Sequence, residues 1–427
     1  MELSQVFVSL REGAKRLSQL TASQKNLGLL AAASSIDKNR KSILQANAID
    51  VELSRQKGVP ESLVDRLSLD DKRIDGIIES IKIVAQSEDP IGSEIAGWKT
   101  PEGLTIRQVR VPLGVAAIIY ESRPNVTADA FALAYKSGNS ILLRGSSSAL
   151  NSNRAIVKAI KEGLENAFDK NNVNQGVPEG IALADSGERS EVDTILTAKG
   201  FIDVVLPRGG ANLIKMVVEK ATVPVIETGS GVCHTFIDET ADIQKAVLIA
   251  ENAKLQRPGV CNAMETLLVH KNIASSFLPE LVKKFDNRAE LRCCSESYQI
   301  INALNLMKDN KLKLATEEDF GFEFLDNILA IKVVENIEQA ILHINSHNTK
   351  HSEAIITQNI SNAKKFQSEI DASSVYVNAS TRFTDGGVFG FGAELGISTQ
   401  KFHVRGPMGL TALTTTKYLI DGDGHTR

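Results

Sequence analysis

Gly114-Val-Ala-Ala-Ile-Ile-Tyr120 is a short apolar run, and a helical stretch separates it from the next one, Ser140-Ile-Leu-Leu-Arg144. The alternation continues through residues 180–184 and 203–206, which predicts βαβ units and a parallel, doubly wound sheet. A second series of runs begins near Val223 and predicts a second α/β domain. Its expected strands are residues 235–238, 266–270, 327–333, 353–357 and 374–378. The fold class is therefore α/β.

The two ends of the chain have different patterns. Residues 3–87 have apolar positions at helical spacing, and Thr21 with Gln24 forms a capping box, so a helical lead-in is expected. Residues 410–420 are rich in threonine and β-branched residues and predict a lone strand. Such a strand must pair elsewhere, either with another subunit or with residues 104–111, which have a similar character.

Length and composition exclude several classes of protein. The 427 residues exceed what one core organises, and 42% hydrophobic with 23% charged residues is typical of a globular protein. With 48 basic and 52 acidic residues the net charge is -4, so nucleic acid is not an expected partner. The longest apolar stretches, such as residues 111–120, are too short to cross a membrane, and no signal peptide is visible. We expect a cytoplasmic protein.

The four cysteines, Cys233, Cys261, Cys293 and Cys294, show no metal-binding spacing and predict reduced thiols. Cys261 stands out in Lys254-Leu-Gln-Arg-Pro-Gly-Val-Cys261-Asn-Ala-Met-Glu-Thr. A helix is expected to stop at Pro258-Gly259, and a strand follows, so the thiol lies on a turn where backbone N–H groups and Arg257 favour the thiolate. A single cysteine is also commonly a small buried hydrophobe, and this alternative stays open on the residues alone.

Three histidines, His343, His347 and His351, recur at four-residue spacing. On one continuous helix they would align as metal ligands. The turn-forming residues 345–349 are expected to end the helix, and no metal site is predicted.

Several segments resemble, in order, the aldehyde dehydrogenase superfamily over residues 104–421. Tyr120-Glu-Ser-Arg-Pro-Asn125-Val-Thr follows a strand where that family carries Pro-Trp-Asn-Phe-Pro. The resemblance implies that Asn125 and the N–H of Cys261 form an oxyanion hole, and that Cys261 is the nucleophile. It also implies a Rossmann-like cofactor domain at residues 1–229, a catalytic domain at 230–405, and an oligomerisation element made by residues 406–427, with 98–112 as a further part.

The resemblance also predicts how a nicotinamide cofactor is held. Ala134-Tyr-Lys-Ser-Gly-Asn-Ser-Ile-Leu-Leu-Arg144-Gly-Ser146-Ser147 matches a segment in which NAD-using members place a glutamate where this chain has Ser147. Losing that carboxylate beside Arg144 favours the 2′-phosphate of NADPH/NADP+. The other expected cofactor residues, besides Ser146, are Arg208, Gly209 and Gly210 before a helix, Glu227 in an element like Glu-Leu-Gly-Gly, and Glu318. Glu227 is also where hydrolytic members keep a general base.

The match is closest to the branch of the family that reduces the acyl phosphate of glutamate, in residues 120–127, 255–263, 377–387 and 389–398. The implied substrate is L-glutamyl 5-phosphate, and the expected substrate residues are Arg257, Asn378, Thr381, Arg382 and Asp385. A homo-oligomer is expected, and a glutamate 5-kinase is a candidate partner. The alternatives are an NAD-dependent hydrolytic aldehyde dehydrogenase and a catalytically silent relative that serves as a binding protein.

Overall fold

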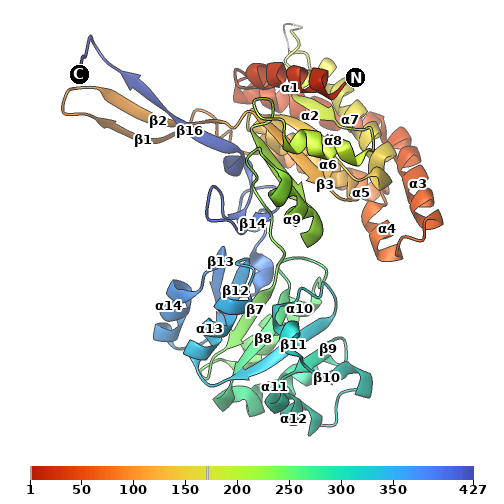
Figure 1. The fold of residues 1–427 in the computed structure, drawn as a ribbon, viewed down its shortest axis with the longest axis vertical. Helices are drawn as coiled ribbons and strands as arrows, with labels where there is room; N and C mark the ends of the chain where they lie inside the picture. The colour runs from red at the N-terminus through yellow and green to blue at the C-terminus, as the bar shows by residue number, and fades with distance from the viewer. Residues whose placement is uncertain (1, 170, 172) are drawn as a thin grey trace. The chain divides into compact units, whose positions relative to one another are not determined.

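The computed structural model of this chain describes residues 2–169, 171 and 173–427, which form two compact units (Figure 1). The first unit contains Met1–Thr228, Gly390–Gly396 and Pro407–Arg427. The second contains Gly229–Phe389 and Ile397–Gly406. Each unit has its own parallel sheet, so the predicted α/β fold class is confirmed.

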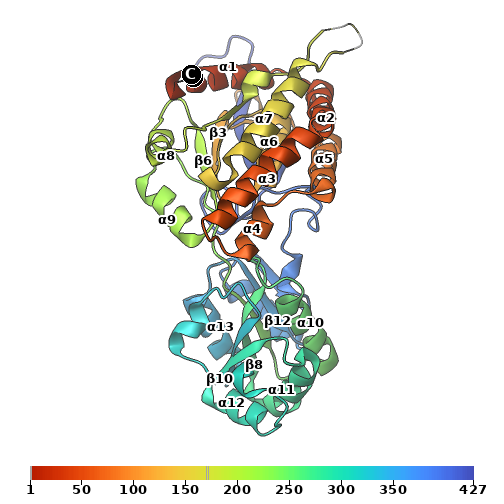
Figure 2. The same ribbon diagram turned by 90° about the vertical axis from the view of Figure 1, so that its right-hand side faces the viewer.

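The helical lead-in of the first unit is five helices long, as its apolar periodicity predicts. They are α1 (Leu3–Leu17), α2 (Ala22–Lys38), α3 (Arg40–Gln56), α4 (Glu61–Leu67) and α5 (Asp71–Gln86). The predicted capping box is present at the start of α2, where Thr21 and Gln24 satisfy each other's backbone N–H groups. Figure 2 shows α2, α3 and α5 packed around α6 (Pro124–Lys136) and α7 (Leu150–Glu165).

The sheet of the first unit has four parallel strands in the order β5-β4-β3-β6. These are β3 (Val115–Tyr120), β4 (Ser140–Arg144), β5 (Ile181–Leu183) and β6 (Val204–Arg208). The remaining elements are η1 (Ser147–Ala149), η2 (Pro178–Gly180), α8 (Arg189–Leu196) and α9 (Ala211–Lys220). Because β4 and β6 lie on opposite sides of β3, the strand order reverses there, and the carboxyl ends of β3 and β6 frame the place where doubly wound sheets bind ligands.

The predicted tail strand is present and pairs within the chain. Helix η6 (Leu410–Leu413) precedes β16 (Thr414–Asp421), which is antiparallel to β2 (Thr105–Pro112), and β2 pairs with β1 (Glu94–Lys99). The suggested partnership with residues 104–111 is thus confirmed. In Figure 1 the three strands extend from the helices of the first unit as a narrow ribbon.

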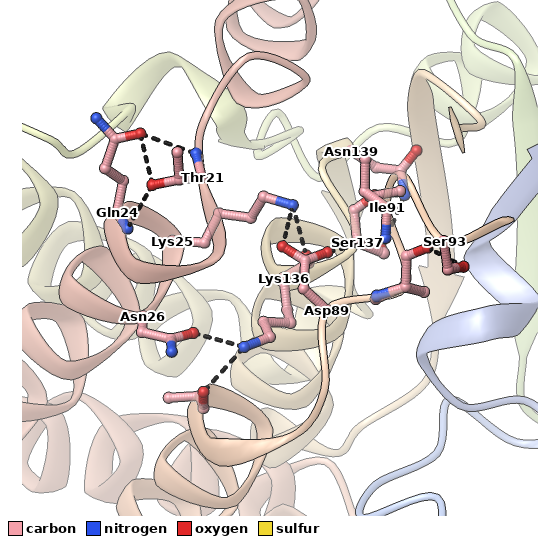
Figure 3. Close-up of polar contacts among 12 residues, drawn as sticks. Thr21, Gln24, Lys25, Asn26, Asp89, Ile91, Ser93, Lys136, Ser137 and Asn139 are labelled. Carbon is pink, nitrogen blue, oxygen red and sulfur yellow. Dashed lines mark hydrogen bonds and ion pairs between the residues drawn. The ribbon is translucent and has the colours of Figure 1, made fainter. Parts of the chain in front are cut away.

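Two buried lysines join the base of this ribbon to the helices (Figure 3). Lys25 and Lys136 are each only 1% exposed. Lys25 Nζ lies 2.7 Å from Asp89 Oδ2, and Lys136 Nζ donates to Asn26 Oδ1 over 2.5 Å. Burying an ammonium costs several kcal/mol unless it is paired and hydrogen-bonded, so these contacts hold α2 against α6 and against the segment that enters β1.

The second unit is a seven-stranded parallel sheet in the order β10-β9-β11-β8-β7-β12-β13. Its strands are β7 (Cys233–Ile237), β8 (Met264–His270), β9 (Glu290–Cys293), β10 (Leu312–Leu314), β11 (Ile328–Val334), β12 (Ser352–Ile356) and β13 (Ser374–Val377). Its helices are α10 (Ile243–Leu255), α11 (Lys271–Phe285), α12 (Ser295–Asn302), η3 (Asp309–Lys311), η4 (Glu317–Gly321), α13 (Ile337–His347), α14 (Ile360–Glu369) and η5 (Thr381–Phe383). Short strands β14 (Ile397–Ser398) and β15 (Gly406–Pro407) pair separately.

Apolar side chains cover this second sheet. Phe277, Leu278 and Leu281 of α11 are fully buried against β8 and β11, and Ile344 of α13 is buried in a second cluster with Phe236. Within the described residues, every helix is too short or too polar to cross a membrane.

Candidate active site

Cys261 lies on a turn between α10 and β8, where the sequence places it. Helix α10 ends at Leu255, and β8 starts at Met264, with the turn closed by a hydrogen bond of 3.0 Å from Ala263 N to Val260 O. The thiol-bearing residue is half-buried, whereas Cys233 and Cys293 are fully buried. The turn therefore presents Cys261 at the amino end of the sheet, as the turn chemistry predicts.

A glycine backs this turn at van der Waals distance. A Cβ built on Gly231 would lie 1.5 Å from the carbonyl oxygen of Cys261, so no side chain fits there. Gly231 N donates to Glu323 Oε1 over 2.7 Å, and Val232 N donates to Thr349 Oγ1 over 3.0 Å. These side chains hold the segment that enters β7 against the turn.

The residue after the nucleophile ties the turn to a distant segment. Asn262 Nδ2 donates to Thr384 O over 2.9 Å, and Thr381 Oγ1 donates to Asn262 O over 2.7 Å. Arg382 also donates to Asn262 Oδ1 and, through Nε, to Gln256 Oε1 over 2.9 Å. Two of the predicted substrate residues, Thr381 and Arg382, thus contact the turn that carries Cys261, and the charge of Asp385 acts on Arg382.

The electrostatics of this group favour an anion. Burial, followed by the charge of Arg257, lowers the pKa of Arg382, while Cys261 and Asp385 oppose that shift. Two guanidinium groups therefore act on each other beside the thiol. Two like charges held close together repel each other, and a bound anion relieves that repulsion.

A second cysteine lies behind the turn, which the sequence did not reveal. Cys233 Sγ donates to Cys261 O over 3.2 Å, and burial raises the pKa of this thiol well above its usual value. Cys233 Sγ also lies 3.8 Å from His351 Nδ1, which lies 2.8 Å from Ser352 Oγ. Cys233 is thus a buried, weakly acidic thiol that supports the turn, whereas Cys261 and Cys294 are the half-buried thiols of the unit.

Other predicted residues of this unit lie apart from the thiol. Asn378 binds both backbone groups of Thr357, with Thr357 N donating to Oδ1 over 2.9 Å and Nδ2 donating to Thr357 O over 2.8 Å. That contact lies at the carboxyl end of β12, whereas Cys261 precedes the amino end of β8. Glu318 is exposed on η4. Helix α13 ends at His347, so His351 lies outside the helix that carries His343.

Asn125 is in the first unit, in the first turn of α6 after Pro124. Its side chain is exposed, and its Nδ2 donates to Asp129 Oδ2 over 3.2 Å. Pro124 fits this position because the first helical N–H has no partner and the ring presets φ. The motif thus presents a side-chain amide just beyond β3.

The predicted cofactor residues near β4 are engaged in contacts of their own. Arg144 is 9% exposed, with Nη2 donating to Glu188 O over 3.1 Å and Nε 3.1 Å from Glu191 Oε2, although that N–H is not aimed at the oxygen. Ser146 caps η1, and Ser147 is exposed. Arg144 therefore meets a carboxylate on α8.

The carboxyl end of β6 has the open backbone that an anion requires. Gly209 and Gly210 are exposed, and α9 starts after Gly210 without a capping side chain. The Glu121 side chain packs against Gly209, where an added Cβ would lie 2.6 Å from its carboxyl carbon. Arg208 precedes the glycines, and Glu227 is half-buried further along the chain.

A hollow of about 460 Å³ beside α7 contains cations that the sequence reasoning missed. The lining carries three cations, Arg154, Lys158 and Lys161, and three carboxylates, Glu162, Glu165 and Asp185, with Leu183 at the end of β5. Arg154 Nε lies 2.7 Å from Asp185 Oδ2, and burial lowers the pKa of Lys161. The sequence pattern could have revealed these cations, because they are spaced four and three residues apart along a helix and therefore lie on one face of it.

Comparisons with known proteins identify the family of this chain. The model of the aldehyde dehydrogenase family matches residues 4–291 and 304–418. A gamma-glutamyl phosphate reductase of Clostridium acetobutylicum is 52% identical over 416 residues, which cover 97% of this chain and 96% of the relative. The gamma-glutamyl phosphate reductase of Thermotoga maritima is 50% identical, covering 100% of this chain and 99% of the relative.

Solved structures give the same relationship. The crystal structure of the Thermotoga maritima gamma-glutamyl phosphate reductase has a TM-score of 0.94 at 50% identity, with each chain fully covered. A propionaldehyde dehydrogenase of Rhodopseudomonas palustris, solved with CoA and an acylated cysteine, has a TM-score of 0.69 at 13% identity, covering 98% of this chain and 96% of that one. The second likeness concerns the fold alone.

Proposed function

The chain belongs to the aldehyde dehydrogenase family and, within it, to the gamma-glutamyl phosphate reductases, and we propose that its reaction runs through a thioester on Cys261. It is an enzyme of proline biosynthesis that reduces gamma-glutamyl phosphate with a nicotinamide cofactor. The observation that supports the thioester is the half-buried Cys261 on a turn beside two arginines.

The proposed cycle begins when the Cys261 thiolate attacks the acyl carbon of L-glutamyl 5-phosphate. The carbonyl oxygen becomes an oxyanion, and we assign its stabilisation to the N–H of Cys261 and the amide of Asn125. Collapse of this adduct breaks the acyl–phosphate bond and leaves a thioester and free phosphate. Reduction of the thioester then releases L-glutamate 5-semialdehyde and regenerates the thiolate.

Arg257 and Arg382 are the proposed partners of the substrate phosphate. Their mutual repulsion is relieved when a dianion binds, and a guanidinium contacts phosphate through two parallel hydrogen bonds. Thr381 and Asp385 support this segment, with Asp385 Oδ1 accepting from Gly387 N over 2.9 Å and from Val388 N over 3.1 Å. Asn378 is proposed to act in folding, because Thr357 uses both ends of its amide.

We propose NADPH as the cofactor, held by the first unit. The exposed Gly209 and Gly210 at the start of α9 suit a pyrophosphate, and the hollow beside α7 suits the adenosine end. Its cations, Arg154, Lys158 and Lys161, suit a 2′-phosphate, with Ser146, Ser147 and Arg144 nearby in sequence. When bound, the reduced nicotinamide supplies the hydride for the thioester. Glu227 and Glu318 are proposed to contact its ribose end.

The nucleophile is tested by replacing Cys261 with alanine. We expect Cys261→Ala to abolish phosphate-dependent reduction of NADP+ with L-glutamate 5-semialdehyde, because no thioester can form, while the thermal midpoint stays near that of the parent. Cys294→Ala, a half-buried thiol elsewhere in the same unit, is the control and should retain activity. Turnover by Cys261→Ala would reject the assignment, and turnover of the parent without phosphate would favour a hydrolytic enzyme.

The cofactor assignment predicts that removing one cation weakens the binding of NADPH more than that of NADH. Lys158→Ala removes a cation that is 79% exposed and whose ion pair with Glu162 is 3.9 Å long. We expect the KM for NADPH to rise about 10-fold and the KM for NADH to change by less than about twofold, since one charged hydrogen bond contributes roughly 1.5 kcal/mol. An equal change for both cofactors would count against a 2′-phosphate contact.

We also propose that the β1-β2-β16 ribbon joins copies of this chain. One face of it carries Trp98, Tyr418 and Ile420, which are 45%, 56% and 58% exposed. Large apolar side chains gathered on one sheet face are typical of a covered surface. Because acyl phosphates hydrolyse in water, the kinase that forms the substrate remains a proposed partner.

A further inference from the structure

A carboxylate four residues further along α6 contacts the amide of Asn125. Asn125 Nδ2 donates to Asp129 Oδ2 over 3.2 Å, and Ser80 Oγ of α5 donates to Asp129 Oδ1 over 2.8 Å. Residues four apart on a helix lie on one face, so this contact needs no distortion of α6. The chain Ser80, Asp129 and Asn125 thus runs from a neighbouring helix to the exposed amide.

The chemistry of the three groups decides which way the amide faces. An asparagine side chain has two nearly isosteric orientations, one presenting N–H groups and one presenting an oxygen. An ionised carboxylate only accepts hydrogen bonds, so it selects the orientation in which Nδ2 faces it. Burial raises the pKa of Asp129, and the hydrogen bonds from Ser80 and Asn125 oppose that rise. One N–H of Nδ2 is used by Asp129, and the second stays available.

We infer that Asp129, supported by Ser80, is a positioning residue that fixes the Asn125 amide with a free N–H for the oxyanion. The inference rests on the proposed role of Asn125 in the reaction. Without Asp129 the amide samples both orientations, and its oxygen would repel the oxyanion in one of them. Removing Asp129 should therefore lower kcat and leave substrate binding nearly unchanged.

The test is a double-mutant cycle in the phosphate-dependent oxidation of L-glutamate 5-semialdehyde. We expect Asn125→Ala to lower kcat about 100-fold or more, the usual effect of losing one oxyanion donor. Asp129→Asn should lower kcat about 10-fold and change KM by less than about twofold. Ser80→Ala, a milder change, should lower kcat about threefold. Asp75→Asn, which removes an exposed carboxylate from the same helix α5, is the matched control.

The decisive variant combines Asn125→Ala with Asp129→Asn. If Asp129 acts through Asn125, the double variant has the kcat of Asn125→Ala within about twofold, whereas independent structural effects multiply. A further loss of about 10-fold in the double variant, or parent kcat in both Asp129→Asn and Ser80→Ala, would overturn the inference. Parent kcat in Asn125→Ala would instead reject the proposed role of Asn125, and with it this inference. The rate of Cys261 alkylation by iodoacetamide checks that the thiol site is intact throughout.

Discussion

Gly231 is a residue whose missing side chain determines where the thiol can lie. A Cβ there would lie 1.5 Å from the Cys261 oxygen and 2.7 Å from its Cα, and these backbone atoms cannot rotate away. We expect Gly231→Ala to displace the turn, to lower kcat about 100-fold, and to cost about 2 kcal/mol in the free energy of unfolding. Steady-state kinetics and denaturant unfolding measure the two effects.

The matched control for this change is Gly76→Ala. Gly76 is exposed inside α5, and a Cβ there has no atom within 4 Å. Alanine should raise the free energy of unfolding by about 0.5–1 kcal/mol through helix propensity and leave kcat unchanged. If Gly231→Ala kept the parent kcat, the close backbone contact would be irrelevant to catalysis.

His343 makes the stability of the second unit sensitive to acid. Burial, followed by the charges of His234 and His347, lowers the pKa of His343 to about 3 from an ordinary value of 6.5. Between these pH values the unfolded chain binds a proton that the folded chain does not. The free energy of unfolding therefore falls as pH drops below 6.5, by up to about 1.4 kcal/mol per pH unit for this group.

His343→Phe should weaken that pH dependence. The ring packs edge-on against Phe320 with centroids 5.5 Å apart and stacks on His347 at 4.2 Å, so phenylalanine keeps the shape and removes the titration. Urea unfolding at pH 5 and pH 7 measures the difference. Leu342→Gln, at an exposed position of the same helix, should keep the parent slope. An unchanged slope in His343→Phe would show that His343 does not contribute.

At the level of elements, the turn before β8 and the segment around η5 act together through Asn262. Asn262→Ala leaves Thr384 O without its hydrogen-bond donor, so we expect the free energy of unfolding to fall by about 1–3 kcal/mol. The change also frees the Arg382 side chain, so we expect the KM for phosphate to rise about 10-fold. Asn378→Ala is the matched control, because it breaks two similar backbone contacts at the other end of the sheet. It should lose similar stability and keep the parent KM, and an equal rise in KM would assign Asn378 to the substrate.

Short, mostly apolar runs were enough to predict β3, β4, β8 and β12, because each of these strands is buried along its whole length. Strand β9 was missed because its Glu290 and Arg292 alternate with buried residues, and β10 is only three residues long. The Cys261 turn was predictable from Pro258-Gly259, which end a helix. The contacts of Gly231, Asn262 and Cys233 with that turn were not, because each joins residues far apart in sequence.

At the scale of the whole molecule, the ribbon of β1, β2 and β16 leaves an apolar surface exposed. Side chains alternate between faces along a strand, so Tyr418 and Ile420 of β16 share a face, and register places Ile420 beside Ile106, which lies beside Trp98. Trp98 and Tyr418 meet edge to face with ring centroids 6.1 Å apart. Lys417, also exposed, points to the opposite face.

If this face joins copies of the chain, a charge placed on it should separate them. We expect Tyr418→Glu to shift the sedimentation of the protein from an oligomer to a monomer, because a carboxylate would be buried without a partner. Lys417→Glu changes more charge on the same strand but on the other face, and should leave the oligomer intact. Neither change touches the buried contacts at the base of the ribbon, so the thermal midpoint of the monomer should change little. An oligomer that survives Tyr418→Glu would place the contact between copies elsewhere on the chain.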